Sequence, residues 1–248
     1  MPHRCLLGLL FAPLLIAGCG AVQSNAPSPP ASTQENATLP QHEGVLTAGF
    51  VGLETVYNSE LMAPYDILQH TVFRDSLHYI RPFIVSPTHA PFTTFEGITI
   101  TPHYSFEDAP PIDVLVIPST GNSMTGDLED EALMTWLKAA VEQARYVITV
   151  CDGAFPLAAT GALNGRIATT FPGDRDRFAE MFPAIDVRYD ANFVVDGKYI
   201  TSVGGALSYE PALYLVESLY GVESARRTAQ GLVLDWDVTT IPHFIARR

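Results

Sequence analysis

The chain has 248 residues, of which 47% are hydrophobic and 17% are charged, a composition that provides a sizeable core and excludes a disordered chain. The 14 Lys and Arg residues are outnumbered by 27 Asp and Glu residues, giving a net charge of −13. Such a charge repels phosphate backbones, so we expect no nucleic acid among the partners of this chain.

An apolar run, CLLGLLFAPLLIAG, follows the first four residues and is shorter than the roughly 20 residues that a membrane-spanning helix needs. It is typical of a signal peptide, and its end resembles the bacterial lipobox, in which Cys19 would become the lipidated first residue of the mature protein. The alternative is an ordinary secretory signal with an incidental cysteine. Since Gly20 rather than Asp follows Cys19, the resemblance implies a lipid anchor on the periplasmic face of the outer membrane.

Residues 1–18 are therefore expected to be a signal peptide, and residues 19–43, rich in Pro, Ser, Ala, Asn and Gln, a flexible tether. The three cysteines are too few and too widely spaced for a disulfide framework or a zinc site. Removal of the signal deletes Cys5, and lipidation uses Cys19. Cys151 would then be the last free thiol, and such a thiol is either buried and inert or chemically active.

From residue 44 onward, strand-like apolar runs alternate with amphipathic stretches, which predicts a mostly parallel sheet with helices on both faces. We expect strands at residues 45–51, 79–85, 114–118 and 146–151. The last two are apolar without alternation, so they should be central strands that are buried on both sides.

Two helices and a hairpin are also expected. Acidic residues at 127 and 129–131 should occupy the first turn of a helix that runs to about residue 144. A second long helix should follow Ser208 and stop at Gly221. Asp196-Gly197, between two apolar runs, predicts a two-residue hairpin turn.

Cys151 ends one of the buried strands, and Asp152-Gly153-Ala154 leads directly into a helix-forming run. This corner lies at the carboxyl end of the sheet, where open α/β folds place their sites, and is typical of a nucleophile elbow. The helix N-terminus favours the thiolate, so we expect a lowered pKa for Cys151. The alternative is a small apolar residue packed at a strand end.

Four stretches resemble, in order, motifs of the DJ-1/PfpI superfamily, which has the class I glutamine amidotransferase-like fold. They are SELMAPYDIL, DVLVIP, VITVCDGAFPLAATGALNGRIATT and YITSVGGALSYEPALYLVESLYG. The resemblance implies one α/β domain over residues 44–236, a flavodoxin-like or Rossmann-like sandwich, with a C-terminal tail at 237–248. It also implies a homodimer.

The resemblance makes Cys151 the nucleophile and Glu60 its carboxyl partner. Backbone amides of Asp152 and Gly153 at the elbow, and of Gly121, are the implied oxyanion donors, although Ser119-Thr120 replaces the usual Gly-Gly before Gly121.

One departure from the family pattern restricts the chemistry. Peptidase-like members have a histidine directly after the cysteine, whereas this chain has Asp152, which disfavours a Cys-His protease. The charge of Asp152 opposes ionisation of the thiol, but we expect its side chain to point toward solvent.

These features predict a cysteine-dependent hydratase or hydrolase of a small molecule, similar to the isonitrile-hydratase-like or glyoxalase-like members of the superfamily. Cys151 would add to an electrophilic carbon, while Glu60 and Asp152 handle protons. Those members need neither a metal nor an organic cofactor, and none is expected here. The alternative is a non-catalytic periplasmic module that binds a ligand, like the sensor domain of AraC-type regulators.

Overall fold

A computed structural model describes residues 44–75 and 78–247. Within these residues the central sheet has eight strands in the order β12-β10-β11-β7-β6-β1-β2-β5. The pair β10 and β11 is antiparallel, and the other neighbours are parallel. The strands of the sheet are β1 (Leu46–Val51), β2 (Ile80–Ser86), β5 (Tyr104–Ser105), β6 (Val114–Ile117), β7 (Tyr146–Val150), β10 (Phe193–Asp196), β11 (Tyr199–Ser202) and β12 (His243–Ile245).

Two short strand pairs lie outside this sheet. They are β3 (Phe92–Thr93) with β4 (Thr99–Ile100), which is antiparallel, and β8 (Ile167–Ala168) with β9 (Asp186–Val187), which is parallel.

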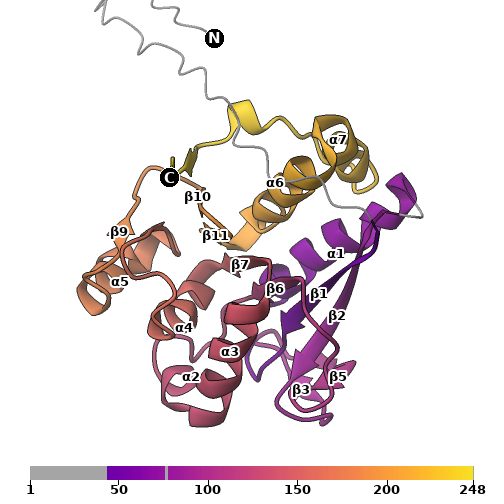
Figure 1. The fold of residues 1–248 in the computed structure, drawn as a ribbon. Helices are drawn as coiled ribbons and strands as arrows, with labels where there is room; N and C mark the ends of the chain where they lie inside the picture. Colours follow the sequence, from indigo (N-terminus) through magenta and orange to yellow (C-terminus); the bar gives the residue numbers. More distant parts are fainter. Residues whose placement is uncertain (1–43, 76–77, 248) are drawn as a thin grey trace, which may run out of the picture. The chain divides into compact units, whose positions relative to one another are not determined.

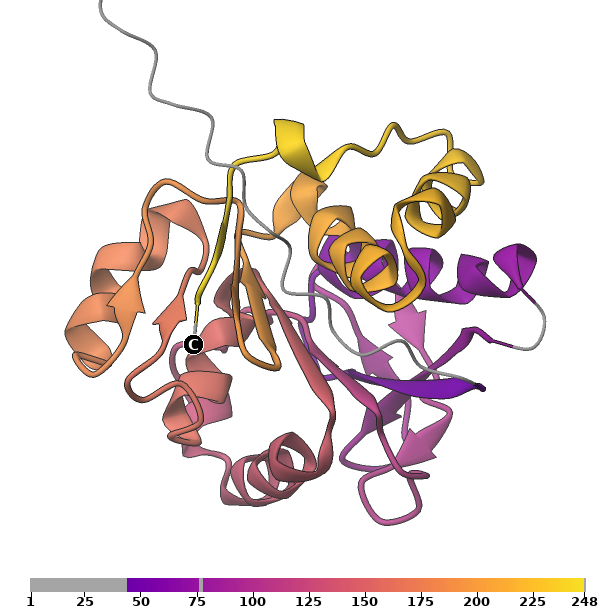
Figure 2. The ribbon, with the colours of Figure 1, turned by 45° about the horizontal axis from the view of Figure 1, so that its top comes forward.

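Helices cover both faces of the sheet, as Figures 1 and 2 show. One face carries α1 (Asn58–Arg74), α6 (Tyr209–Tyr220) and α7 (Val222–Gln230), and the other carries α2 (Gly126–Glu129), α3 (Glu131–Gln143), α4 (Ala154–Ala159) and α5 (Arg175–Met181). Alternate residues of β6 enter opposite cores, Val114 and Val116 one and Leu115 and Ile117 the other. The predicted α/β sandwich with central strands buried on both sides is confirmed.

Local signals explain where several elements end. The helix α6 stops at Gly221, whose φ of 86° suits glycine. Gly197, with a φ of 63°, joins β10 to β11 in the predicted hairpin. The acidic run before α3 is not a single first turn, because Asp130 ends α2 and caps α3, accepting from the amides of Ala132 and Leu133.

The C-terminal segment belongs to the sheet rather than forming a separate tail. A short turn, η4 (Val238–Thr240), leads into β12, which pairs in parallel with β10. The amide of Ala246 donates to the carbonyl oxygen of Val195 at 2.8 Å. The expected domain boundary at residue 236 therefore lies too early, since a three-residue edge strand is too short to produce a sequence pattern.

The predicted signal peptide, the tether and Cys19 lie outside the described residues. None of the helices in the described part is long and apolar enough to span a bilayer.

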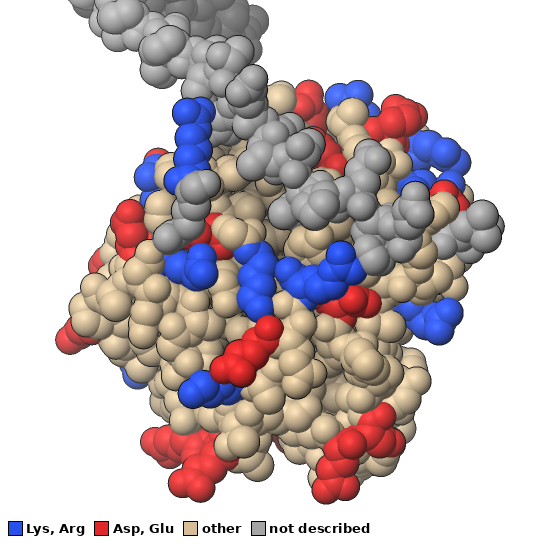
Figure 3. Space-filling model, in the orientation of Figure 1, with Lys and Arg blue, Asp and Glu red and all other residues tan. Residues whose placement is uncertain are grey.

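Acidic and basic side chains are interspersed on the face drawn in Figure 3.

Candidate active site

Cys151 lies at the corner between β7 and α4, in the short turn η1 (Cys151–Gly153). Its φ of 55° is in the left-handed region, which costs a non-glycine residue about 1–2 kcal/mol. Its side chain is almost buried, with 7% of the residue exposed. The sharp corner expected from the sequence is therefore present, and its strain is typical of a functional site.

Two glycines make room for this corner. A Cβ on Gly153 would lie 2.0 Å from the carbonyl oxygen of Ile117 in β6, so only glycine allows this close approach. A Cβ on Gly204, which follows β11 and has a φ of 79°, would lie 2.4 Å from the Cβ of Cys151. Sequence reasoning missed Gly204, although the Gly-Gly pair at 204–205 was an available signal.

Glu60 projects from the first turn of α1 and is 5% exposed. Its Oε2 accepts from the amide and the hydroxyl of Ser119 at 3.1 and 2.5 Å. The amide of Gly205 and the thiol of Cys151 also donate to this carboxylate. Burial nevertheless raises the pKa of Glu60, against the opposing effect of these donors.

Cys151 is a protonated thiol in this environment. Burial raises its pKa, and the negative charges of Glu60 and then Asp152 add to the effect. The hydroxyl of Ser119 acts in the opposite direction but is weaker. The expected lowering of the pKa is wrong, because two carboxyl groups and burial outweigh the helix N-terminus. A nucleophilic thiolate then requires a base, and Glu60 is in contact to serve as one.

Asp152 does not point to solvent, contrary to the expectation. It is 9% exposed, and its Oδ1 lies 2.9 Å from the hydroxyl of Thr170. Its carboxyl also interacts with that of Asp174, a residue to which sequence reasoning gave no role. Burial above all raises the pKa of Asp152, to about 7, and the neighbouring charges of Asp174 and Glu60 contribute. The segment 170–174 covers this side of the elbow.

The loop after β6 does not supply the expected oxyanion donor. The amide of Gly121 donates to the carbonyl oxygen of Thr55 at 3.1 Å, and the amide of Thr120 donates to the hydroxyl of Ser123 at 2.8 Å. The amide of Ser119 is held by Glu60. Because all three amides have protein partners, the elbow amides of Asp152 and Gly153 remain the candidate donors.

These groups meet at a cavity of about 290 Å³. Three of its lining residues have carboxyl groups and none is Lys, Arg or His, which favours an uncharged or cationic ligand over an anionic one. Aromatic and apolar walls come from Tyr57, Met124 and Phe171. The lining residues are Tyr57, Glu60, Thr120, Gly121, Ser123, Met124, Cys151, Asp152, Phe171 and Asp174.

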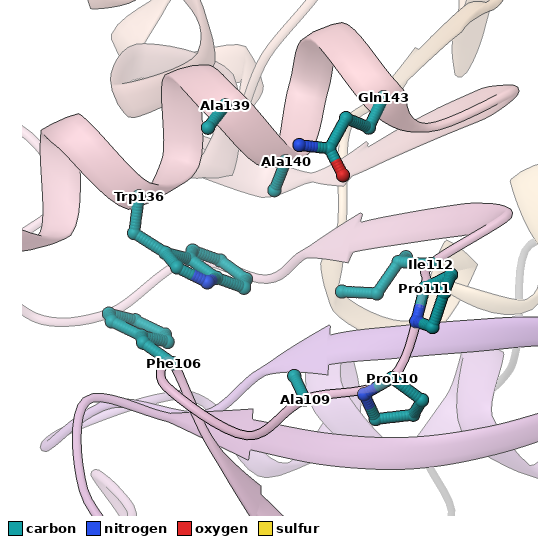
Figure 4. A pocket seen from close by; sticks show the side chains of 9 residues that line it. All are labelled: Phe106, Ala109, Pro110, Pro111, Ile112, Trp136, Ala139, Ala140 and Gln143. Carbon is teal, nitrogen blue, oxygen red and sulfur yellow. The ribbon is translucent and has the colours of Figure 1, made fainter.

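A second cavity, of about 330 Å³, lies between α3 and the segment that leads into β6 (Figure 4). The rings of Phe106 and Trp136 stack there with centroids 4.0 Å apart. Its lining is apolar apart from Gln143 and has no ionisable or nucleophilic side chain, so we place the chemistry at Cys151. Among the described residues, no group of three or more His, Cys, Asp or Glu side chains could hold a metal ion.

Comparison with known proteins places this site in a family. Residues 47–218 match the model of the DJ-1/PfpI family. The chain is 34% identical to isonitrile hydratase of Pseudomonas putida over 182 residues, which is 73% of this chain and 75% of that protein.

Two solved structures have the same fold. A ThiJ/PfpI family protein from Pseudomonas syringae has a TM-score of 0.69 at 22% identity, covering 87% of this chain and 84% of that one. An AraC family transcriptional regulator from Pseudomonas putida has a TM-score of 0.65 at 20% identity, covering 75% of this chain and 99% of that one. At these identities the two structures establish the fold alone.

Proposed function

The chain belongs to the DJ-1/PfpI family, and from this membership and its site we propose that it is a cysteine-dependent hydratase of an uncharged small molecule. The observation that carries the proposal is the cavity that brings a thiol together with three carboxyl groups and no basic side chain. The similarity to isonitrile hydratase makes an isonitrile the first substrate to test. A glyoxalase-like or hydrolytic reaction at the same cysteine is the broader form of the proposal.

The first chemical step follows from the contact between Glu60 and Cys151. Glu60 accepts the thiol proton as the sulfur bonds to the terminal carbon of the isonitrile, and then gives this proton to the same carbon. The result is a thioimidate on Cys151, in which one S–C bond and one C–H bond have formed and no atom has left. Water must then add to this carbon, and the S–C bond must break, before a formamide is released.

The test is formamide production from n-butyl isonitrile, followed by NMR with wild type, Cys151→Ala and Glu60→Gln. We expect turnover by wild type, none by Cys151→Ala and a loss of at least about 100-fold in Glu60→Gln. Asp176→Asn is the surface control, because Asp176 is exposed and does not line the cavity. Methylglyoxal and a small amide, run in parallel, test the broader form. Equal turnover by wild type and Cys151→Ala would contradict the proposal.

A sensor module is the second candidate, supported by the fold shared with the AraC family regulator. In that case the cavity binds a ligand without turnover, and Cys151 contributes only packing. Calorimetry with candidate ligands separates the two, since a sensor keeps its affinity in Cys151→Ala and shows no product in wild type.

We also propose that Cys19 is lipidated and anchors the domain to the cell envelope, on the periplasmic face of the outer membrane. Support comes from the order of apolar run, lipobox-like residues and polar tether in the sequence. Labelled palmitate should enter wild type and Cys5→Ser but not Cys19→Ser in a bacterial host, and an unlabelled wild type would contradict the proposal. The homodimer stays a prediction, for which light scattering on the purified protein is the measurement.

A further inference from the structure

A second carboxyl cluster lies beside Cys151 and is distinct from Glu60. The carboxyl groups of Asp152 and Asp174 interact with each other, and both line the cavity that Cys151 faces. Two neighbouring carboxyl groups resist being ionised together, because their negative charges repel each other. The pair therefore holds a single proton, as two carboxyl groups confined to one site usually do.

The hydroxyl of Thr170 only partly compensates a negative charge on Asp152. Its Oγ1 lies 3.0 Å from the carbonyl oxygen of Cys151 and 2.9 Å from Oδ1 of Asp152. A carbonyl oxygen only accepts, and the hydroxyl has one hydrogen to give. Asp152 shares this hydrogen with a carbonyl oxygen, so the hydroxyl offsets only part of the effect of burial, which favours the protonated form of Asp152.

The position of Asp174 is fixed by the residue that follows it. Arg175 is buried, and its guanidinium donates to the hydroxyl oxygen of Thr169 at 3.1 Å and to the carbonyl oxygens of Tyr189 and Ala191 at 2.7 and 2.9 Å. These bonds direct the guanidinium toward oxygens outside the pair. The turn η2 (Pro172–Asp174) is closed by the amide of Asp174, which donates to the carbonyl oxygen of Phe171 at 3.0 Å.

Glu60 and the pair differ in their access to water. The carboxylate of Glu60 already accepts from Ser119, Gly205 and Cys151, which leaves it little capacity to bind a further water molecule. Asp174 is only half-buried and lies at the cavity wall. Water that enters the cavity can therefore reach Asp174 while Glu60 is occupied.

We propose that Asp152 and Asp174 together form the acid–base pair that adds water to the covalent intermediate on Cys151, a step separate from the one served by Glu60. This inference rests on the proposed hydratase function. The ionised carboxylate takes a proton from water as its oxygen bonds to the thioimidate carbon, and the protonated carboxyl gives its proton to the nitrogen. The pair ends with one proton, as it began. The S–C bond then breaks, the hydroxyl proton returns to sulfur through Glu60, and the formamide leaves.

The test separates adduct formation from turnover in the full chain with n-butyl isonitrile. Asp174→Asn should still form the adduct on Cys151, seen as a mass increase of one isonitrile on the peptide that contains Cys151, while formamide production falls about 100-fold. Asp176→Asn, two residues further on and exposed, should behave as wild type. Normal turnover in Asp174→Asn, or equal loss of adduct and turnover, would overturn the proposal. A wild type that forms neither adduct nor formamide rejects the hydratase function instead.

The pH dependence of turnover distinguishes an acid–base role of Asp152 and Asp174 from a merely structural one. Wild-type turnover should fall as the pH rises through about 7, where the pair loses its proton. Glu60, Cys151 and Tyr57 also face this region and are unchanged in Asp174→Asn. Removing the charge of Asp174 lowers the pKa of Asp152, so the fall of the residual turnover should shift to lower pH. An unshifted profile would argue against the pair.

Infrared spectroscopy tests the shared proton without any substrate. A carboxylic-acid C=O band should disappear as the pH rises from about 5.5 to about 8.5, on either side of the pKa of about 7. This band should be missing from Asp152→Asn and reduced or displaced in Asp174→Asn, while Asp176→Asn retains it. A band that is identical in all three variants would show that the pair does not hold the proton.

Discussion

Replacing Asp152 with asparagine should stabilise the protein at alkaline pH and change little in acid. Asparagine has nearly the same shape, stays uncharged, and can still accept from Thr170 and donate to Asp174, so it mimics the protonated side chain. In wild type, burial above all raises the pKa of Asp152 from 3.8 to about 7. The stability that the raised pKa contributes is fully present below 3.8 and is lost as the pH rises through about 7.

The size of the effect follows from these two pKa values. A tenfold difference in proton affinity is worth about 1.4 kcal/mol, so ionisation of Asp152 costs at most about 4 kcal/mol of unfolding free energy. Asp174 shares the proton, and water in the cavity screens the charge, so we expect about half of this, or about 2 kcal/mol. For a protein of this size, that corresponds to about 4–8 °C in Tm.

The assay is thermal unfolding of wild type and Asp152→Asn at several pH values from about 4 to about 8.5. The stability advantage of the variant should be near zero at the acid end, grow with pH and level off above about 7. Asp176→Asn is the matched control and should not reproduce this trend. A difference that is constant with pH, or that grows as the pH falls, would refute the conclusion that Asp152 is held protonated.

Three further outcomes follow from the site. Burial and the charge of Glu60 raise the pKa of the Cys151 thiol, so its alkylation should be slow near neutral pH and the rate should keep rising above about pH 9. The rate, measured by mass spectrometry of the peptide that contains Cys151, should be higher in Glu60→Gln. A rate that reaches a plateau below neutral pH would contradict this. Gly204→Ala should abolish activity, because the new Cβ would collide with Cys151. Gly205 has open space around it and a φ of 58°, so Gly205→Ala should remain active and lose only about 1 kcal/mol of stability, measured by urea unfolding. Arg175→Lys should lower the stability by at least about 2 kcal/mol, because lysine cannot keep all three bonds to Thr169, Tyr189 and Ala191; a change below about 0.5 kcal/mol would show that these bonds do not hold the segment.

Elements with strong local signals could be predicted from the sequence. The strands β6 and β7 are continuous apolar runs, and the hairpin at Gly197 and the end of α6 at Gly221 have the residues that these conformations require. Cys151 directly follows β7 and precedes a helix-forming run, and this local pattern indicated the elbow. By contrast, β12 is three residues long and is stabilised by pairing with β10, so no local pattern reveals it.

The electrostatics of the site depended on contacts between distant segments and could not be predicted. Asp174 follows Asp152 by more than twenty positions, and only the turn anchored by Arg175 brings the two carboxyl groups together. The engaged amide of Gly121 likewise depends on Thr55, from the segment after β1. A helix N-terminus lowers the pKa of a thiol only where no stronger effect opposes it, and here the carboxyl groups of Glu60 and Asp152 and the burial of Cys151 do so.

The charges around Cys151 favour one kind of transition state over another. Hydrolysis of an amide builds negative charge on an oxygen, which Glu60, Asp152 and Asp174 oppose and which the engaged amide of Gly121 cannot stabilise. Addition of the thiol to an isonitrile carbon, with its proton returned to that carbon through Glu60, ends in an uncharged thioimidate and builds no negative charge on an oxygen. The raised pKa values of Cys151 and Asp152 also keep protons within the site near neutral pH, where hydration requires them. The carboxyl groups that keep the Cys151 thiol protonated therefore favour hydration of an uncharged carbon–nitrogen bond over acyl transfer.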